Sequence, residues 1–474
     1  MPRESSELLI DRGLIRVGSF LRRNRYPLIL LLVSLCTYGF FSLHNGTSFS
    51  LYYTGDEPHY VVIVKSLVEG HLYVEDVYRD PRPEWTTWPY SWHAVKGPDS
   101  HFYSTHGLGL PLLVALFYII GGSLGVILFI PSITTLVNLF QYFACRRITG
   151  NDRVSFITTL VMGFATLIFA YSNQLYPELV MSLLLLASLN LVLKYGLTNS
   201  VQLAVGLLIG YGFLLKAAYA AIIVGLGLAL SLVCITKRRP NFILFFAGAA
   251  VWLAAFCFYN TIAFGSAFAV PLASGESAYP QILANNATFA ATGLIFDRYR
   301  GLLLYSPILL MSVLGMRPLF KERPDVFALA TSAVLVEYVG TSLFTHWWAG
   351  FSLPARYLVS ILPLFSLPLS LALRNDFRKQ WFKAGMYCTI YLGLYLNLTM
   401  SWSRAVGLNV NTAKSEMLST AYLGLDRVFP VILNSQDLVS ISFTQLLLWL
   451  SGLSVIVLLT ILWTKAKTSR VRLG

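Results

Sequence analysis

Charged residues are scarce in this chain. They make up 12% of its 474 residues, whereas hydrophobic residues make up 56%. Soluble domains carry roughly twice that share of charge, so the composition excludes a soluble globular protein and indicates a chain that lies mostly in lipid. Cysteine is also scarce, and the five cysteines lie in or at the ends of apolar segments. This pattern gives no indication of a disulfide framework.

Acidic residues are fewer than basic ones, 22 against 35, and the formal net charge is +13. Of the 35 Lys and Arg residues, 24 fall in the two terminal segments and the short connections on one side of the predicted spans. By the positive-inside rule that side is cytoplasmic, and both termini lie there. The basic excess is therefore a membrane-orientation signal, and we expect no nucleic-acid partner.

Apolar windows of transmembrane length recur along the chain and predict an all-α, polytopic membrane protein with about 12 transmembrane helices. We divide the apolar stretch Val201–Ile235 into two spans at Lys216, because this places the lysine charge near a membrane interface and not in the middle of the bilayer. The predicted spans are Pro27–Leu43, Leu124–Cys145, Val154–Asn173, Leu179–Val192, Val201–Leu215, Ala217–Ile235, Phe242–Phe264, Leu302–Met316, Val326–Thr345, Ala355–Leu373, Ala384–Trp402 and Ser442–Trp463.

The connections on the non-cytoplasmic side include three long segments, 44–123, 265–301 and 403–441. Long loops usually carry binding or catalysis, so we expect the active site on that face. The chain accordingly divides into a cytoplasmic lead-in (1–26), a transmembrane catalytic module (27–402) that includes the outside loop 44–123, and a last part (403–474) with an outside loop, a span and a basic tail.

The first outside loop contains the stretch T-G-D-E-P-H-Y, from Thr54 to Tyr60. Apolar residues recur at helical spacing after Pro58, which predicts a short amphipathic helix lying on the membrane surface. Its N-terminus would hold Asp56 and Glu57 ionised, and a fixed carboxylate can act as a general base. A solvated acidic turn is the alternative. The apolar stretch His106–Gly121 predicts a second surface or re-entrant helix.

Four more motifs follow in chain order: H-G-L-G-L-P from His106, Y-P-E ending at Glu178, L-L-K-A-A-Y around Lys216, and R-Y-L from Arg356 with a downstream Leu362-Pro363. Together with Asp56-Glu57, they resemble the GT-C glycosyltransferases, integral-membrane enzymes that take sugars from polyprenyl-phosphate carriers. The similarity is greatest to the protein O-mannosyltransferase and lipid A aminoarabinose transferase branch, although this chain has no lysine at the His106 motif.

The resemblance implies an inverting sugar transfer from a polyprenyl-phosphate-linked donor to a protein, lipid or glycan. Asp56 would be the base, with Glu57 and Glu178 beside it in the catalytic group. A divalent metal ion could be held by Asp56, His59 and Glu178. Phosphate and substrate would be bound by cationic, histidine and tyrosine side chains: His59, His106, Lys216, Arg298, Arg300, Arg356 and Tyr357.

Structural roles are the alternatives for several of these positions. Glu178 suits the first turn of a span, Lys216 can extend to the interface, and Arg298 and Arg300 can anchor a span by pairing with Asp297. A polyprenyl-lipid or glycolipid flippase is the alternative function, although the sequence shows no internal repeat of the kind many transporters have. Glu337, predicted within a span, should face a polar interior.

Overall fold

Helices account for nearly all of the regular structure. The computed structural model describes residues 24–46, 55–80, 92–236, 242–271, 287–350 and 352–402. The helices of the first half are α2 (Arg25–Gly46), α3 (Glu57–Val68), α4 (Glu75–Arg79), α5 (Gly109–Thr149), α6 (Asp152–Phe164), α7 (Leu167–Tyr171), α8 (Glu178–Tyr195), α9 (Asn199–Gly210), α10 (Gly212–Leu215), α11 (Ala220–Thr236) and α12 (Ile243–Phe264). Those of the second half are α14 (Ala287–Phe296), α15 (Leu302–Tyr305), α16 (Leu309–Glu322), α17 (Pro324–Leu343), α18 (Ser366–Asp376) and α19 (Gln380–Trp402).

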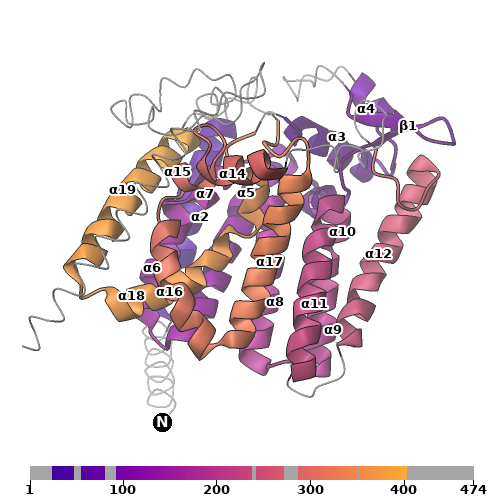
Figure 1. The fold of residues 1–474 in the computed structure, drawn as a ribbon. Coiled ribbons are helices and arrows are strands. Elements are labelled where there is room, and N and C mark those ends of the chain that lie inside the picture. Colours follow the sequence, from indigo (N-terminus) through magenta and orange to yellow (C-terminus); the bar gives the residue numbers. More distant parts are fainter. Residues whose placement is uncertain are drawn as a thin grey trace, which may run out of the picture.

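The long helices stand side by side in a bundle, with α3, α4, α14 and α15 at one end of it (Figure 1). Helix α5 contacts α2, α3 and α8, while α9 packs on α12, α11 on α17 and α16 on α18. Among the described residues, three short 3₁₀ helices connect longer elements: η1 (Ala217–Tyr219) between α10 and α11, and η2 (Arg356–Ser360) and η3 (Leu362–Phe365) before α18. Breaks of this kind leave polar backbone groups outside regular helix, where a site can form.

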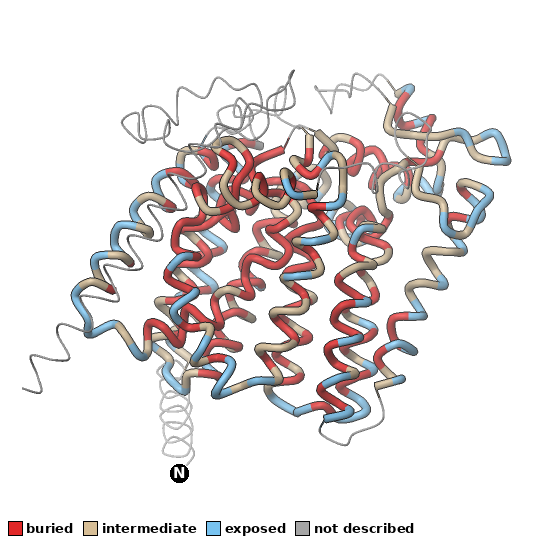
Figure 2. The backbone as a smooth tube through the Cα atoms, viewed as in Figure 1, coloured by how far each residue is buried: buried red, intermediate tan, exposed pale blue. Residues whose placement is uncertain are grey.

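Large apolar side chains cover much of the outer surface, and Figure 2 shows the exposed residues on the outside of the bundle. Ile120, Leu232 and Phe258 are 88%, 65% and 70% exposed. Such a surface is stable only in lipid. Among the described residues, six helices are long and apolar enough to cross a membrane. The chain is therefore an integral, multi-pass membrane protein, although the predicted count of 12 spans is not confirmed.

Several predicted spans are interrupted helices. Val154–Asn173 is divided between α6 and α7, Val201–Leu215 between α9 and α10, and Leu302–Met316 between α15 and α16. The predicted span Ala355–Leu373 is not one continuous α-helix either: it forms η2, η3 and the first part of α18. A hydropathy window measures only how apolar a segment is. A break in the helix does not change that composition, so hydropathy could not reveal these breaks. The predicted span Ser442–Trp463 lies outside the described residues.

The predicted first outside loop, 44–123, contains a helix at each of the two expected places. Helix α3 follows the T-G-D-E-P-H-Y stretch as expected, but most of its residues are buried, and its position on the membrane surface stays a prediction. The second stretch, His106–Gly121, forms the first part of α5. Gly122, with φ 55° and ψ −138°, separates this part from the following span. The sequence did not predict the antiparallel hairpin of β1 (Ala94–Lys96) and β2 (Phe102–Ser104) between α4 and α5.

Close packing of α16 on α18 depends on Gly315. A Cβ atom added there would lie 1.7 Å from the carbonyl oxygen of Pro368. We expect Gly315→Ala to lower the free energy of unfolding by about 1–3 kcal/mol, because backbone has to move. Gly340→Ala in α17 is the matched control, since its new Cβ would meet only the Ala221 Cβ at 3.6 Å. Thermal unfolding in detergent measures both, and equal midpoints would contradict the prediction.

Candidate active site

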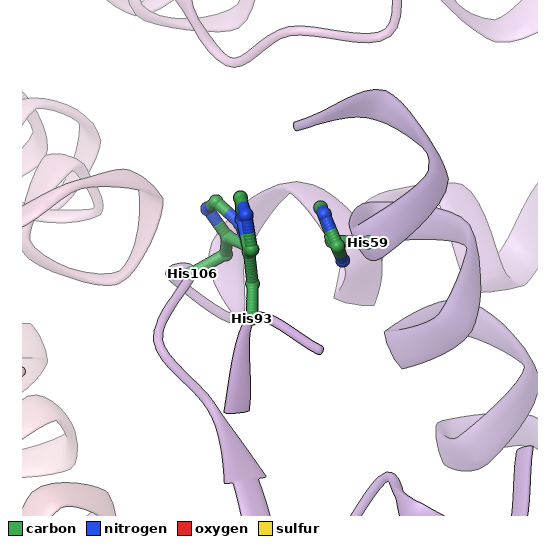
Figure 3. A group of neighbouring side chains, drawn as sticks. All are labelled: His59, His93 and His106. Atoms are coloured by element: carbon green, nitrogen blue, oxygen red, sulfur yellow. The ribbon is translucent and has the colours of Figure 1, made fainter. Parts of the chain in front are cut away.

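Three histidines from separate segments of the first loop lie together (Figure 3). His59 is on α3, His93 precedes β1 and His106 follows β2. The hairpin aligns the last two, because Ala94 pairs with Ser104 and the Thr105 N–H donates to the His93 carbonyl at 3.0 Å. The ring nitrogens His93 Nδ1 and His106 Nε2 are 3.0 Å apart, and the His59 ring stacks on His93 at 3.7 Å.

Sequence reasoning missed His93. The signal for it was the turn sequence G-P-D-S, Gly97–Ser100, between two short β-type stretches, which is typical of a hairpin. A hairpin at that position places His93 beside His106. Burial lowers the pKa of His93, and it lowers the pKa of His106 to about 4. Both rings are therefore neutral at physiological pH.

The acidic pair of the first loop divides between two roles. Glu57 is fully buried and its Oε1 accepts the Leu175 N–H at 2.6 Å, which ties the start of α3 to the segment before α8. Asp56, at the N-cap of α3, makes no capping hydrogen bond with its side chain. Its Oδ2 instead accepts from Arg356 Nη1 at 2.6 Å. Within the described contacts, Asp56 is thus the member of the pair that binds Arg356.

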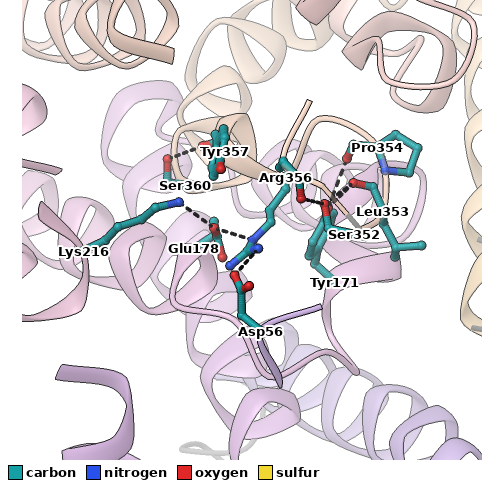
Figure 4. A network of polar contacts seen from close by, with 11 residues as sticks. Asp56, Tyr171, Glu178, Lys216, Ser352, Leu353, Pro354, Arg356, Tyr357 and Ser360 are labelled. Atoms are coloured by element: carbon teal, nitrogen blue, oxygen red, sulfur yellow. Dashed lines mark hydrogen bonds and ion pairs between the residues drawn. The ribbon is translucent and has the colours of Figure 1, made fainter. Parts of the chain in front are cut away.

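Arg356 joins two carboxylates that are far apart in the sequence (Figure 4). Its Nη1 binds Asp56, and its Nε donates to Glu178 Oε1 at 3.0 Å. The guanidinium also lies 3.8 Å from the centroid of the Tyr176 ring. The side chains of Arg356 and Glu178 are 4% and 1% exposed, whereas that of Asp56 is 26% exposed. Asp56 is therefore the carboxylate of this pair that an incoming molecule can reach.

Lys216 completes the cluster on the other side of Glu178. Its Nζ lies 3.8 Å from Glu178 Oε1 and 3.7 Å from the centroid of the Tyr357 ring. The extended backbone of Lys216 breaks the helix between α10 and η1, so the side chain enters the cluster instead of continuing along a helix face. The four charged groups sum to zero. Glu337 is buried on α17, as expected, and interacts electrostatically with Lys216.

A strained turn aims Arg356 at this cluster. Ala355 has φ 48°, a left-handed conformation that is uncommon for a residue with a side chain. The turn is held from two sides: the Tyr171 hydroxyl donates to the Leu353 carbonyl at 2.5 Å, and the Ala355 N–H donates to the Arg300 carbonyl at 3.1 Å. The surroundings therefore keep Arg356 in place at some conformational cost.

The remaining predicted phosphate ligands lie beside this turn. Arg300 is buried and donates through Nη1 and Nη2 to the carbonyls of Ser352 and Gly350, at 3.0 and 3.1 Å. Its guanidinium thus supports the segment that leads to Arg356. The Arg298 carbonyl accepts from the Tyr305 hydroxyl at 3.0 Å. A direct role for these two arginines in phosphate binding stays a prediction.

Electrostatics keep Asp56 ionised. Burial on its own would raise the pKa of Asp56, but the charge and hydrogen bond of Arg356, together with smaller contributions from His106 and Lys216, outweigh it and hold the pKa well below the ordinary range. On Glu178, the second oxygen, Oε2, is buried and has no hydrogen-bond partner among the described residues. A buried acceptor without a partner is costly, and this oxygen has room in its bonding for one further donor.

The hairpin is attached to α4 by an ion pair whose strength should depend on pH. His101 Nδ1 lies 2.5 Å from Glu75 Oε1, and this contact raises the pKa of His101. The pKa of Glu75 is lowered, because the hydrogen bonds from His101 and Phe102 outweigh its burial. Because the pKa of His101 is raised, its charged form stabilises the folded hairpin below the ordinary value of 6.5, and this stabilisation is lost as the pH rises. Because the pKa of Glu75 is lowered, its charged form stabilises the hairpin above the ordinary value of 4.5, and this stabilisation is lost as the pH falls.

We therefore expect residues 92–104 to be best protected from hydrogen exchange between those two ordinary values and less protected in alkaline solution. Hydrogen exchange with mass spectrometry, corrected for the intrinsic pH dependence of the exchange rate, measures this. His101→Gln should remove the loss of protection on the alkaline side. The same loss in both proteins would show that another group is responsible.

The described residues thus form a bundle of membrane helices with interrupted elements, and the first loop supplies Asp56 to a charged cluster with Arg356. The chain is similar to the solved structure of ArnT from Cupriavidus metallidurans bound to undecaprenyl phosphate, with 15% identity and a TM-score of 0.53 over 84% of this chain and 72% of that one. This likeness confirms the expected GT-C fold.

A second similar structure is the archaeal oligosaccharyltransferase AglB from Archaeoglobus fulgidus, in complex with an inhibitory peptide and a dolichol-phosphate. The identity is 14% and the TM-score 0.48, over 86% of this chain and 56% of that one. No protein-family model and no curated protein sequence matches the chain. At these identities the likeness concerns the fold, and the activity has to be argued from the site.

Proposed function

We propose that this protein is a glycosyltransferase that moves a sugar from a polyprenyl-phosphate-linked donor to an acceptor, with inversion, at the non-cytoplasmic face of the membrane. The observation that carries the proposal is the arrangement around Arg356, which binds Asp56 and Glu178 while Lys216 approaches Glu178. Buried ionic groups in a membrane protein are expensive, and they usually mark a functional site.

Asp56 acts on the acceptor. Its carboxylate is ionised and is the more exposed of the two that Arg356 binds. It accepts a hydrogen bond from the attacking hydroxyl or amine and takes the proton as the new bond to the anomeric carbon forms. Because a carboxylate with a low pKa is a weak base, proton transfer occurs late, when the acceptor has already become acidic. A single attack opposite the leaving phosphate gives inversion.

The cations act on the donor. In the free protein the positive charges of Arg356 and Lys216 are balanced by the carboxylates of Asp56 and Glu178. A donor phosphate therefore has to compete with these carboxylates for one of the two cations. Arg356 can offer parallel N–H groups to a phosphate oxygen, and Lys216 supplies a compact charge on the other side of Glu178. Both stabilise the negative charge that develops on the departing phosphate. The Glu178 Oε2 atom, which has no hydrogen-bond partner among the described residues, is an acceptor for the second substrate.

The metal arrangement expected from the sequence is not part of this proposal. Asp56 and Glu178 both bind Arg356, whereas His59 lies with His93 and His106. The side of the membrane on which transfer occurs is inferred from the positive-inside rule. By that rule both termini are cytoplasmic and the first loop lies on the opposite side. Protein, lipid and glycan all remain candidate acceptors.

Purified protein in detergent, supplied with synthetic polyprenyl-phosphate sugars and a panel of acceptors, tests the proposal. We expect a glycosylated product whose anomeric configuration, read by NMR, is opposite to that of the donor. Reconstituted vesicles with a labelled polyprenyl-phosphate sugar provide the second arm. Movement of the lipid between leaflets without product would replace the proposal with a flippase.

A further inference from the structure

The three histidines of the first loop form a group that the transfer chemistry above does not use. One ring nitrogen from each of His59, His93 and His106 lies within 4.8 Å of those of the other two. His59 is 3% exposed, so this group is not a solvated surface cluster. In the part of the chain that the structure describes, it is the one set of three His, Cys, Asp or Glu side chains gathered so closely.

The hydrogen bonds around these rings match those of metal ligands. The Nδ1 atom of His59 is 2.6 Å from the Tyr78 hydroxyl, which fixes the ring and leaves Nε2 as the nitrogen available to a metal. Metal-binding histidines are commonly oriented in this way through their second nitrogen. The His93 and His106 nitrogens, 3.0 Å apart, are close to the roughly 3.3 Å that separates two ligands of a tetrahedral zinc ion with Zn–N bonds of about 2.0–2.1 Å.

We propose that His59, His93 and His106 bind one divalent transition-metal ion, with Zn²⁺ preferred, through one ring nitrogen each. Three neutral imidazoles suit zinc and its neighbours in the first transition series better than Mg²⁺ or Ca²⁺, which require oxygen ligands. Three protein ligands also leave one coordination position open, as in catalytic zinc sites.

One of the three histidines, His106, borders a cavity. A small cavity of about 50 Å³ adjoins the cluster, lined by Thr105, His106 and Leu108 from the loop and by Tyr259 and Asn260 from α12. Asp56 interacts electrostatically with all three histidines, so a bound cation would lie near a carboxylate. The ion would thereby connect α3 to the hairpin beside the charged cluster.

Metal content tests the proposal without any substrate. The full chain is purified with an affinity tag that contains no histidine, loaded with Zn²⁺, dialysed and analysed by plasma mass spectrometry. We expect about one zinc ion per chain in the wild type. His93→Ala should lower the zinc affinity by about tenfold or more, whereas His346→Ala, at an exposed histidine beyond α17, should leave it unchanged.

Two further readouts separate a metal site from a loss of folding. Co²⁺-loaded wild type should show the intense visible bands of a four-coordinate site, and Zn²⁺ should raise the thermal unfolding midpoint of the wild type but not that of His93→Ala. A dialysed wild type that retains no zinc, or equal zinc content in the wild type and His93→Ala, would overturn the proposal. Either result would leave the proposed transfer reaction standing, because no step of it uses the metal.

Discussion

Replacing Asp56 with Asn is expected to reduce sugar transfer by about a hundredfold or more, since general bases contribute factors of about 10² to 10⁴. Asn has nearly the same shape as Asp, and its amide oxygen can still accept the hydrogen bond from Arg356 Nη1 that Asp56 Oδ2 accepts at 2.6 Å. The variant loses the negative charge and the ability to take a proton. The rate of product formation, measured with saturating donor, reports this loss.

Two other acidic residues of the first loop supply the controls. Asp76→Asn changes an exposed carboxylate on α4 and should transfer at the wild-type rate. Glu57→Gln weakens the hydrogen bond from the Leu175 N–H, so it should lower the thermal unfolding midpoint. The folded fraction of this variant should transfer sugar at close to the wild-type rate. If Asp56→Asn retained most of the activity while binding donor normally, the base would have to be sought elsewhere, with Glu178 as the next candidate.

Much of the charged cluster could be named from the sequence. Glu178, Lys216 and Arg356 each stand at an end of a predicted span, where a charge in a membrane protein needs a reason, and Asp56 lies in the first long loop just before a predicted helix. The pairing could not be predicted, because Arg356 meets Asp56 across 300 residues and no local pattern encodes that contact. The different positions of Asp56 and Glu57 depend on the Leu175 N–H, a tertiary contact that adjacent acidic residues in a sequence do not reveal.

The fold was predictable in class and less so in detail. Apolar composition identified a helical membrane protein, and helical spacing located α3 to within a residue or two. The break at Lys216 was predicted from its charge, and the structure has an extended residue there. The turn before Arg356 was not readable as local structure, because it depends on contacts such as that of Tyr171 with the Leu353 carbonyl. These breaks are where the cluster forms. The regular part of the bundle follows from hydropathy, whereas the irregular part that carries the site follows from tertiary contacts.

Arg356→Gln is expected to lower both stability and activity. It leaves Glu178, which is 1% exposed, without its main partner, and breaking a buried ion pair on one side costs about 3–5 kcal/mol. Lys216 Nζ, 3.8 Å from Glu178, offsets part of this cost. Transfer should fall by about a hundredfold or more, since the variant lacks the guanidinium that stabilises the departing phosphate. Thermal unfolding in detergent and single-turnover transfer by the folded fraction measure the two effects separately.

The double variant Arg356→Gln/Glu178→Gln distinguishes the structural role of Arg356 from its role in transfer. Replacing Glu178 with Gln as well removes the uncompensated negative charge, so the unfolding midpoint should recover toward that of the wild type. The stability losses of the two single variants should therefore not add in the double variant. Transfer should not recover, because a neutral pair cannot bind the phosphate. Recovery of both would mean that Arg356 only neutralises Glu178, and simple addition of the two stability losses would mean that the pair is not coupled.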